Sequence, residues 1–269
     1  MNKIYSCFPG GYHKALTMSY DDGRLADRRL VEIFNRYGIR GTFNLNSGLW
    51  GENSDRVGPE EIPGLYAGHE VACHTVTHPT IARCPLPETA QQVLEDRRAL
   101  EALVGYPVRG LAYPNGSWSE DITRLLPMLG IRYGRLVNTT GGFGLPEDPL
   151  RWQGTCHHNQ RLLELGAQFN ALCKKQYLYL MYVWGHSYEF DQQNNWSLME
   201  DFCRLTGGRD DVWYCTNIEL VDAMESFRRL QFAADNSFVY NPSAAACWIR
   251  VNDGEPLAIP AGTCVRLDG

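Results

Sequence analysis

The sequence lacks an excess of positive charge and any long apolar run. Its 269 residues carry 25 lysines and arginines against 31 aspartates and glutamates, which gives a net charge of −6. Without a basic field to attract a phosphate backbone, nucleic acid is not an expected partner. The longest apolar-rich run, residues 177–184, is far shorter than the roughly 20 residues that span a bilayer, so no membrane contact is expected either.

The sequence also lacks a CxxC motif and a recognisable secretory signal. Nine cysteines is an odd number, and a chain of this length does not need disulfide bonds for stability. Residues 1–14 contain neither the apolar core nor the small-residue cleavage site of a signal peptide. We therefore expect reduced, mostly buried thiols in a cytoplasmic protein. The sequence does not indicate an oligomeric state.

Short apolar runs alternate with amphipathic segments, which is the pattern of repeated βα units. Buried strands are expected at residues 15–20, 42–45, 111–113 and 177–184, and helices at residues 25–37, 90–104, 160–174 and 216–230. Ser117 with Glu120, and Thr216 with Glu219, have the spacing of helix capping boxes. Six or seven such units predict an α/β fold built on a parallel sheet or barrel.

The pattern changes from Phe232 onward. Short strand-like runs follow one another, separated by Asn-Asp-Gly and Pro-Ala-Gly turns. We therefore expect two parts, a (β/α) barrel over residues 1–231 and a small β-rich appendage over residues 232–269.

Two adjacent carboxylates, Asp21 and Asp22, directly follow the first predicted strand and precede Gly23. Asp-Asp-Gly is also good turn chemistry, so the tripeptide alone does not identify a site. Its position is more informative, because the carboxyl ends of parallel strands are where α/β folds place their sites.

Two histidines, His74 and His78, follow another predicted strand. A spacing of four places both imidazoles on one face of a helical turn, from which they could share a metal ion. On their own they are equally compatible with solvated or hydrogen-bonded side chains. Together with a carboxylate at the end of the first strand, they make the two-histidine, one-aspartate set of a catalytic metal site.

Four motifs occur in a fixed order: SYDDG at 19–23, HTVTH at 74–78, LAYPNG at 111–116 and VWGH at 183–186. In this order they resemble the polysaccharide deacetylase family, the NodB-homology or carbohydrate esterase family 4 enzymes, across about residues 15–230. The resemblance implies a distorted, TIM-like (β/α)7 barrel of NodB-homology type, followed here by the C-terminal β appendage. It also implies a divalent metal as cofactor, most commonly zinc.

The resemblance assigns roles to the first two motifs residue by residue. Asp21 corresponds to the general base, and Asp22, His74 and His78 correspond to the metal ligands. Physical chemistry agrees with this division, because a metal lowers the pKa of water while the neighbouring carboxylate stays free to accept a proton.

The later motifs correspond to the remaining roles, and at two positions they differ from the family pattern. His186 corresponds to the general acid that protonates the departing amine, and the backbone N–H of Asn115 corresponds to the oxyanion donor. Ala112 stands where the family usually has an arginine paired with the base, so another residue must substitute or the base is tuned differently. Trp184 replaces a leucine that commonly lines the acetyl pocket, which predicts a narrower acyl pocket. The family's fourth motif has no clear copy.

Aromatic and polar residues near these motifs are candidates for the substrate pocket. We expect the pocket to draw on Tyr113, Trp184, Tyr188, Glu189 and His157. The adjacent pair His157 and His158 cannot both face one ion from a strand, which favours a loop or supporting role over a second metal.

These residues predict a metal-dependent hydrolase that removes N-acetyl, or O-acetyl, groups from an amino sugar or oligosaccharide. A second enzymatic hypothesis keeps the site but changes the substrate to another small-molecule C–N bond, of the cyclic ureide or imide type. A third hypothesis is a carbohydrate-binding pseudoenzyme, which the missing arginine at residue 112 and the β appendage would favour. In each case the expected partner is a carbohydrate or another small polar molecule.

Overall fold

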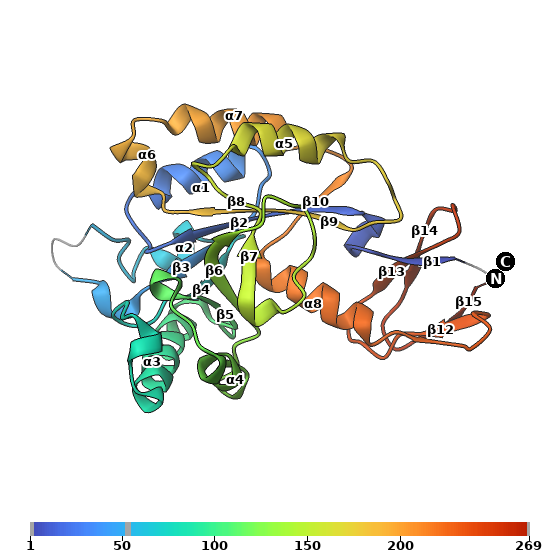
Figure 1. Ribbon diagram of the computed structural model, residues 1–269, viewed down its shortest axis with the longest axis horizontal. Helices are drawn as coiled ribbons and strands as arrows, with labels where there is room; N and C mark the ends of the chain where they lie inside the picture. The colour runs from blue at the N-terminus through green and yellow to red at the C-terminus, as the bar shows by residue number, and fades with distance from the viewer. Residues whose placement is uncertain (1–2, 52–54, 268–269) are drawn as a thin grey trace.

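A computed structural model describes residues 3–51 and 55–267 of the chain (Figure 1). Its centre is a parallel sheet whose main strands are β2 (Lys14–Asp21), β3 (Gly41–Leu45), β4 (Glu70–Cys73), β5 (Gly110–Ala112), β6 (Tyr133–Thr139) and β9 (Tyr179–Gly185). The sheet runs in the order β9, β2, β3, β4, β5, β6, and β10 (Val212–Tyr214) pairs with the first half of β2. All these pairings are parallel, as the alternating pattern predicts.

Residues 152–157 close the sheet into a barrel. Their first half, β7 (Trp152–Gly154), pairs with β6, and their second half, β8 (Cys156–His157), pairs with β9. Between the halves, the backbone N–H of Thr155 donates to the carbonyl of Tyr182 at 2.7 Å. Counting 152–157 as one stretch gives a ring of seven, which confirms the distorted (β/α)7 architecture.

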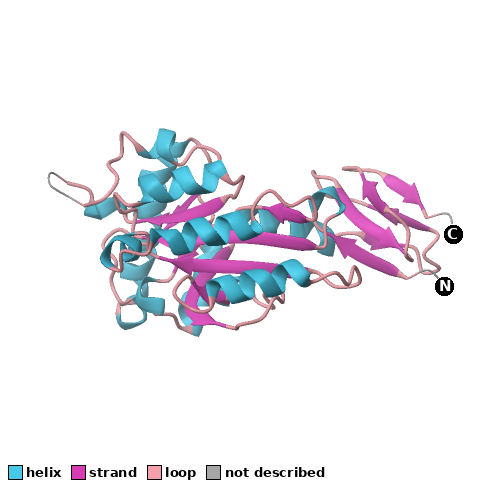
Figure 2. Ribbon diagram, turned by 90° about the horizontal axis from the view of Figure 1, so that it is seen from above, coloured by secondary structure: helices cyan, strands magenta, loops and turns pink. Residues whose placement is uncertain are grey.

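Helices cover the outside of this ring, and the strands lie between them (Figure 2). The helices are α1 (Asp27–Arg36), α2 (Ile62–Leu65), α3 (Leu86–Val104), α4 (Glu120–Met128), α5 (Leu162–Ala171), α6 (Tyr188–Gln192), α7 (Trp196–Thr206) and α8 (Asn217–Arg228). Five further turns of 3₁₀ helix lie at Pro9–Gly11, Ser47–Leu49, Ile81–Arg83, Pro114–Gly116 and Pro149–Arg151. Of the described residues, no helical segment combines the length and the apolar character needed to cross a membrane.

Two local helix signals have different outcomes. The capping box of Thr216 and Glu219 is confirmed at the start of α8. The predicted box of Ser117 and Glu120 is wrong, because Ser119 is the N-cap of α4 and accepts the backbone N–H of Ile122 at 3.3 Å. The hydroxyl of Ser117 instead accepts the backbone N–H of Ala82, so it links two segments that are far apart in the sequence.

The end of the chain forms two small antiparallel sheets beside the barrel (Figure 1). One contains β1 (Ile4–Cys7), β13 (Cys247–Val251) and β14 (Pro256–Ile259); the other contains β11 (Gln231–Phe232), β12 (Phe238–Tyr240) and β15 (Cys264–Arg266). The strand-like character predicted for this region is confirmed. Strand β1 joins it from the other end of the chain, and the division of the chain at residue 231 stays a prediction.

One large apolar core includes Leu16, Met18 and Phe34, and a second, separate cluster includes Tyr133, Trp152 and Tyr182. The small sheets have an apolar core of their own. Six of the nine cysteines are buried, as expected for cysteines that act as small apolar residues. The strand ends carrying the four motifs all lie at the carboxyl edge of neighbouring strands, so the fold brings the motifs together.

Candidate metal and catalytic site

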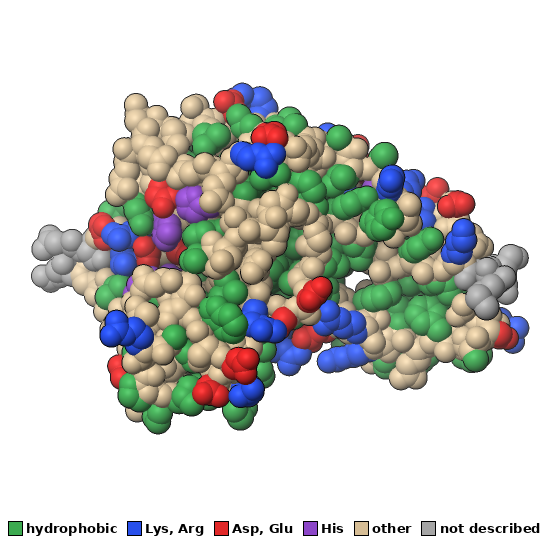
Figure 3. Space-filling view, in the orientation of Figure 1, with side chains coloured by type: hydrophobic (Ala, Val, Ile, Leu, Met, Phe, Trp, Pro, Cys, Tyr) green, Lys and Arg blue, Asp and Glu red, His purple; other side chains and the backbone are tan. Residues whose placement is uncertain are grey.

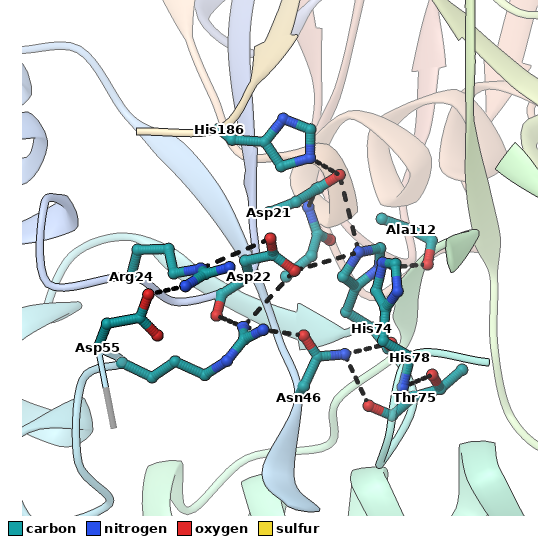
Figure 4. Close-up of polar contacts among 12 residues, drawn as sticks. Asp21, Asp22, Arg24, Asn46, Asp55, His74, Thr75, His78, Ala112 and His186 are labelled. Atoms are coloured by element: carbon teal, nitrogen blue, oxygen red, sulfur yellow. Dashed lines mark hydrogen bonds and ion pairs between the residues drawn. The ribbon is translucent and has the colours of Figure 1, made fainter. Parts of the chain in front are cut away.

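Asp21 ends β2 and Asp22 follows it, and both side chains lie at the carboxyl edge of the barrel (Figure 4). Asp21 is the last residue of the strand, whereas Asp22 has a φ of 81°, a left-handed conformation that few side chains adopt. In a regular strand, two consecutive side chains would point to opposite faces. The left-handed conformation of Asp22 turns its carboxylate to the same side as that of Asp21. Both therefore face the same site.

The two histidines of the second motif lie in a loop that follows β4, and the predicted helical turn is wrong. Thr75 and His78 have φ values of 66° and 58°, which no α-helix contains. The hydroxyl of Thr75 accepts the backbone N–H of His78 at 3.2 Å. The side-chain amide of Asn46, at the end of β3, donates to the carbonyls of His74 and Thr75 at 2.5 and 2.9 Å. The loop brings the rings together by another route, with centroids 4.7 Å apart.

Asp22, His74 and His78 form a set that fits a divalent metal. One ligand atom from each lies within 4.8 Å of the others. The Nδ1–H of His74 donates to the carbonyl of Ala112 at 2.8 Å, which leaves the Nε2 lone pair facing Asp22, 4.0 Å from its Oδ1. Burial lowers the pKa of His74 to about 4, outweighing the opposing effect of the Asp21 carboxylate, so the ring is in the neutral form that binds metals.

Two arginines hold Asp22 from the outer side. The guanidinium of Arg56 donates to the backbone carbonyl of Asp22 and lies 3.5 Å from its Oδ1. It also donates to the side chain of Asn46 at 3.2 Å, which links Asp22 to the histidine loop. The Nε of Arg24 lies 3.7 Å from Asp22 Oδ2. This network, drawn in Figure 4, fixes the Asp22 carboxylate relative to the two imidazoles.

Asp21 is paired with an arginine that the sequence analysis did not identify. Arg135, fully buried on β6, donates from Nη2 to both oxygens of the Asp21 carboxylate. The side-chain amide of Asn44 donates to Oδ1 at 2.9 Å. Although burial raises the pKa of Asp21, the charges of Arg135, His74 and His186 lower it to about 2, so the carboxylate is ionised at neutral pH.

Arg135 supplies the positive charge that the family motif usually has at the position of Ala112. In the pairing of β5 with β6, Ala112 lies directly opposite Arg135, so the cation comes from the adjacent strand. A charged residue in the middle of the otherwise uncharged run of residues 133–137 was the available signal. The guanidinium also lies over the ring of Trp184, 4.6 Å from its centroid. Asp21 therefore has a buried cationic partner, and Trp184 packs against that partner.

His186 lies on the other side of Asp21, directly after β9. Its Nε2 is 3.9 Å from Asp21 Oδ2, and its Nδ1 is 3.1 Å from an oxygen of Glu189. Asn115 follows β5 with a φ of 56°, and its side chain donates to the hydroxyl of Thr80 at 3.2 Å. In the strand order, β9 neighbours β2 and β4 neighbours β5, with β3 between the two pairs, so the residues that follow these strands lie along one edge of the sheet.

The predicted pocket residues divide into two groups. Trp184, Tyr188, Glu189 and His157 cluster with His186: the ring centroids of His157 and Trp184 are 4.6 Å apart, and those of His186 and Tyr188 are 5.3 Å apart. Tyr113 is placed differently, because its ring is fully buried in the main core and its hydroxyl donates to the carbonyl of Leu150. Its polar atom is therefore used within the fold.

On the surface, histidine and acidic side chains gather at the end of the molecule opposite the small sheets (Figure 3). Other cavities lie away from these residues. One, of about 340 Å³, lies between α8 and the sheet of β1 and β13 and is lined in part by Trp213 and Trp248. The candidate metal-binding and catalytic residues therefore lie at the carboxyl edge of the barrel, apart from that cavity.

Comparison with known proteins agrees with the first three motifs, which lie within residues 11–134. Residues 11–134 match the family model described as polysaccharide deacetylase, which confirms the resemblance found in the sequence. A chitooligosaccharide deacetylase of Sinorhizobium fredii is 45% identical over 109 residues, which cover 39% of this chain and 48% of that protein. The chain thus spans about half the length of this curated relative.

Solved structures show the same fold at low sequence identity. A putative polysaccharide deacetylase from Mycobacterium smegmatis superimposes with a TM-score of 0.62 and 16% identity, covering 83% of this chain and 95% of that one. A family 4 pseudoenzyme from Bacillus anthracis, BA3943, superimposes with a TM-score of 0.52 and 18% identity, covering 81% and 68%. Because a pseudoenzyme shares the fold, the fold alone does not establish activity.

Proposed function

We propose that this chain, whose residues 11–134 belong to the polysaccharide deacetylase family, is a metal-dependent hydrolase that removes N-acetyl groups from an amino sugar or chitooligosaccharide. The observation that carries the proposal is the arrangement around Asp21. A three-residue ligand set lies on one side of this carboxylate, and His186 lies on the other. A base, an acid and a cation site are thus within reach of one substrate bond.

Asp22, His74 and His78 would hold the metal, and zinc suits their mixture of nitrogen and oxygen donors. A divalent cation bound there supplies positive charge that polarises the acyl carbonyl and acidifies water. Asp21 accepts the proton of the attacking water, and Arg135 keeps this carboxylate ionised and oriented. In this proposal the backbone N–H of Asn115 donates to the oxygen that becomes negative, and His186 gives its Nε2 proton to the departing amine nitrogen.

The pseudoenzyme hypothesis loses its main support in this arrangement. It rested on the absence of an arginine at residue 112, and Arg135 supplies a guanidinium to the same carboxylate from the next strand. Trp184 beside Arg135 leaves the prediction of a narrow acyl pocket in place, which suits an acetyl group better than a longer acyl chain.

Acetate release from N-acetylated chitooligosaccharides tests the proposal. We expect activity that is lost after treatment with a chelator and restored by zinc, and that is unchanged in Asp121→Asn, which removes an exposed carboxylate on α4. Metal-dependent hydrolysis of a cyclic ureide or imide, without acetate release, would reassign the substrate. Oligosaccharide binding without any hydrolysis by the zinc-loaded protein would favour the pseudoenzyme.

A further inference from the structure

Beside the proposed acid, one carboxylate is shared by three imidazoles. An oxygen of Glu189, on α6, lies 3.1 Å from Nδ1 of His186. The other oxygen lies 3.2 Å from Nε2 of His157 and 2.9 Å from Nε2 of His158. His157 is the last residue of β8, which pairs with β9, and His158 follows it. The cluster therefore connects the end of β8 to α6, the helix that follows β9.

The inner member of this cluster is built into the core. His158 is fully buried, and its ring stacks against those of Tyr20 and Phe190, at centroid distances of 5.8 and 4.2 Å. A Cβ at Gly185 would lie 2.0 Å from Nδ1 of His158, so the strand can pass the ring only with glycine at this position. The backbone is therefore shaped around the imidazole that faces Glu189.

The proton positions distinguish a hydrogen-bond network from a second metal site. The ligand atoms of His157, His158 and Glu189 are close enough to one another to suggest a metal. However, the backbone N–H of Asn159 donates to Nδ1 of His157 at 3.2 Å. A neutral ring that accepts at Nδ1 carries its proton on Nε2, which is the atom directed at Glu189. That nitrogen directs its N–H toward the carboxylate and has no lone pair for a metal.

We propose that Glu189 is a positioning residue that holds His186 through its Nδ1–H, and that His157 and His158 hold the Glu189 carboxylate in turn. This inference rests on the proposed function, in which His186 is the acid. With its Nδ1–H on Glu189, His186 presents Nε2 to the space beside Asp21. When the C–N bond breaks, its electron pair stays on nitrogen, and the Nε2 proton moves to that nitrogen.

The carboxylates of Asp21 and Glu189 both favour the protonated form of His186. Asp21 faces it from β2, Glu189 from α6 and His157 from β8, while Tyr188, with Arg24 over its ring, covers the outer side. Burial lowers the pKa of His186, but the hydrogen bond to Glu189 and the charge of Asp21 outweigh burial and raise it. The three imidazoles in turn hold the pKa of Glu189 well below its usual range against the effect of burial.

Nitrogen-detected NMR of the zinc-loaded, full-length protein tests the inference without relying on activity. The spectrum of His186→Gln identifies the His186 signals. Above its pKa, we expect His186 to carry its proton on Nδ1 and His157 to carry its proton on Nε2. A His157 ring protonated on Nδ1, together with a second bound zinc ion per chain, would overturn the network and indicate a metal site.

Glu189→Gln, which keeps the side-chain shape but removes the charge, gives a second readout. We expect the pKa of His186 to fall by about one unit or more, because an adjacent anion favours the charged imidazole. We expect kcat to fall about 10- to 100-fold with little change in KM, and the alkaline limb of the pH profile to move to lower pH. The matched control is Glu164→Gln, an exposed carboxylate on α5 paired with Arg161.

The two proposals fail in different ways. If the pKa of His186 falls in Glu189→Gln but no substrate is hydrolysed by the wild-type protein, the proposed function is wrong and the positioning contact stands. If deacetylation occurs and both the pKa and kcat of Glu189→Gln equal those of the control, the positioning role is wrong.

Discussion

At the scale of single residues, the most informative contact is that of Arg135 with Asp21. The family motif led us to look for a cation at residue 112, on β5. The side chain comes instead from the position directly opposite on β6. Neighbouring strands lie about 4.8 Å apart, so a long side chain can reach the same carboxylate from either one. A motif read along the chain cannot detect a substitution that crosses between strands.

Arg135→Ala should cost both stability and activity, because it leaves the buried Asp21 carboxylate without its cation. Breaking a buried ion pair costs about 3 to 5 kcal/mol of the free energy of unfolding. The double variant Ala112→Arg with Arg135→Ala moves the guanidinium to the family position and should recover part of both losses. Urea unfolding and acetate release measure the effects. Failure of the double variant to improve on Arg135→Ala would show that the two positions are not equivalent.

Asp21 and His78 should separate catalysis from metal binding. Asp21→Asn keeps the ligand set but removes the proton acceptor, so acetate release should fall by about 100-fold or more while one zinc ion per chain is retained. His78→Gln should lose the zinc itself. Metal content by mass spectrometry, measured beside activity, checks both outcomes. Loss of zinc from Asp21→Asn would instead place Asp21 among the ligands.

At the scale of elements, the sequence predicted which strand ends carry the chemistry but not how the loops hold it. Hydrophobic periodicity located β2, β5 and β9, and three of the motifs lie at the carboxyl ends of these strands. The helical turn at 74–78 was wrong because spacing alone cannot show that Asn46 and Asp96 hold the loop in another conformation. Asp96, on α3, accepts the backbone N–H groups of Ser47 and His74. Such contacts join segments far apart in sequence, and no local pattern reports them.

Glu70, at the start of β4, joins three other elements and should make stability depend on pH. Its carboxyl group accepts hydrogen bonds from the hydroxyls of Thr42 and Tyr133 and from the backbone N–H of Ile218, in the first turn of α8. Burial outweighs these donors and raises the pKa of Glu70 from 4.5 to about 7. Between these two pH values the folded chain binds more protons than the unfolded chain, so the stability contributed by protonated Glu70 is lost as pH rises.

Glu70→Gln mimics the protonated side chain and should remove this dependence. The interval from 4.5 to about 7 corresponds to about 3 kcal/mol, so the wild type should lose up to that amount relative to the variant across it. Other titrating groups contribute equally to both proteins and cancel in the difference. Urea unfolding at a series of pH values measures it. A difference that stays constant from pH 4.5 to 7.5 would show that Glu70 is ionised throughout.

At the scale of the whole molecule, the seven-membered barrel could be predicted from the motif order and the alternating pattern, but its connections could not. Residues 152–157 pair with different strands in their two halves, and both halves are too short for periodicity to identify. Strand β1 pairs with β13, nearly the full length of the chain away. Long-range pairing of this kind depends on complementary surfaces, which a linear pattern does not contain.

The small sheets and the candidate site lie at opposite ends of the molecule, so weakening one should leave the other unchanged (Figures 1 and 3). Ile249, on β13, is fully buried with Val239, Ile259 and Leu267, and Phe227 of α8 packs against this cluster. Ile249→Ala should cost about 2 to 5 kcal/mol of local stability. We expect faster hydrogen exchange across residues 232–267, unchanged exchange in β2, and unchanged acetate release.

The control for this variant is Arg266→Ala, an exposed substitution on β15 that removes no buried contact. Exchange confined to residues 232–267 and β1 would support an appendage that opens separately from the barrel, because a cooperative unit exchanges together. Faster exchange in β2 as well, with a matching loss of acetate release, would show that the small sheets and the barrel form one cooperative unit. The predicted division of the chain at residue 231 would then be wrong, and the pairing of β1 with β13 would be the structural reason.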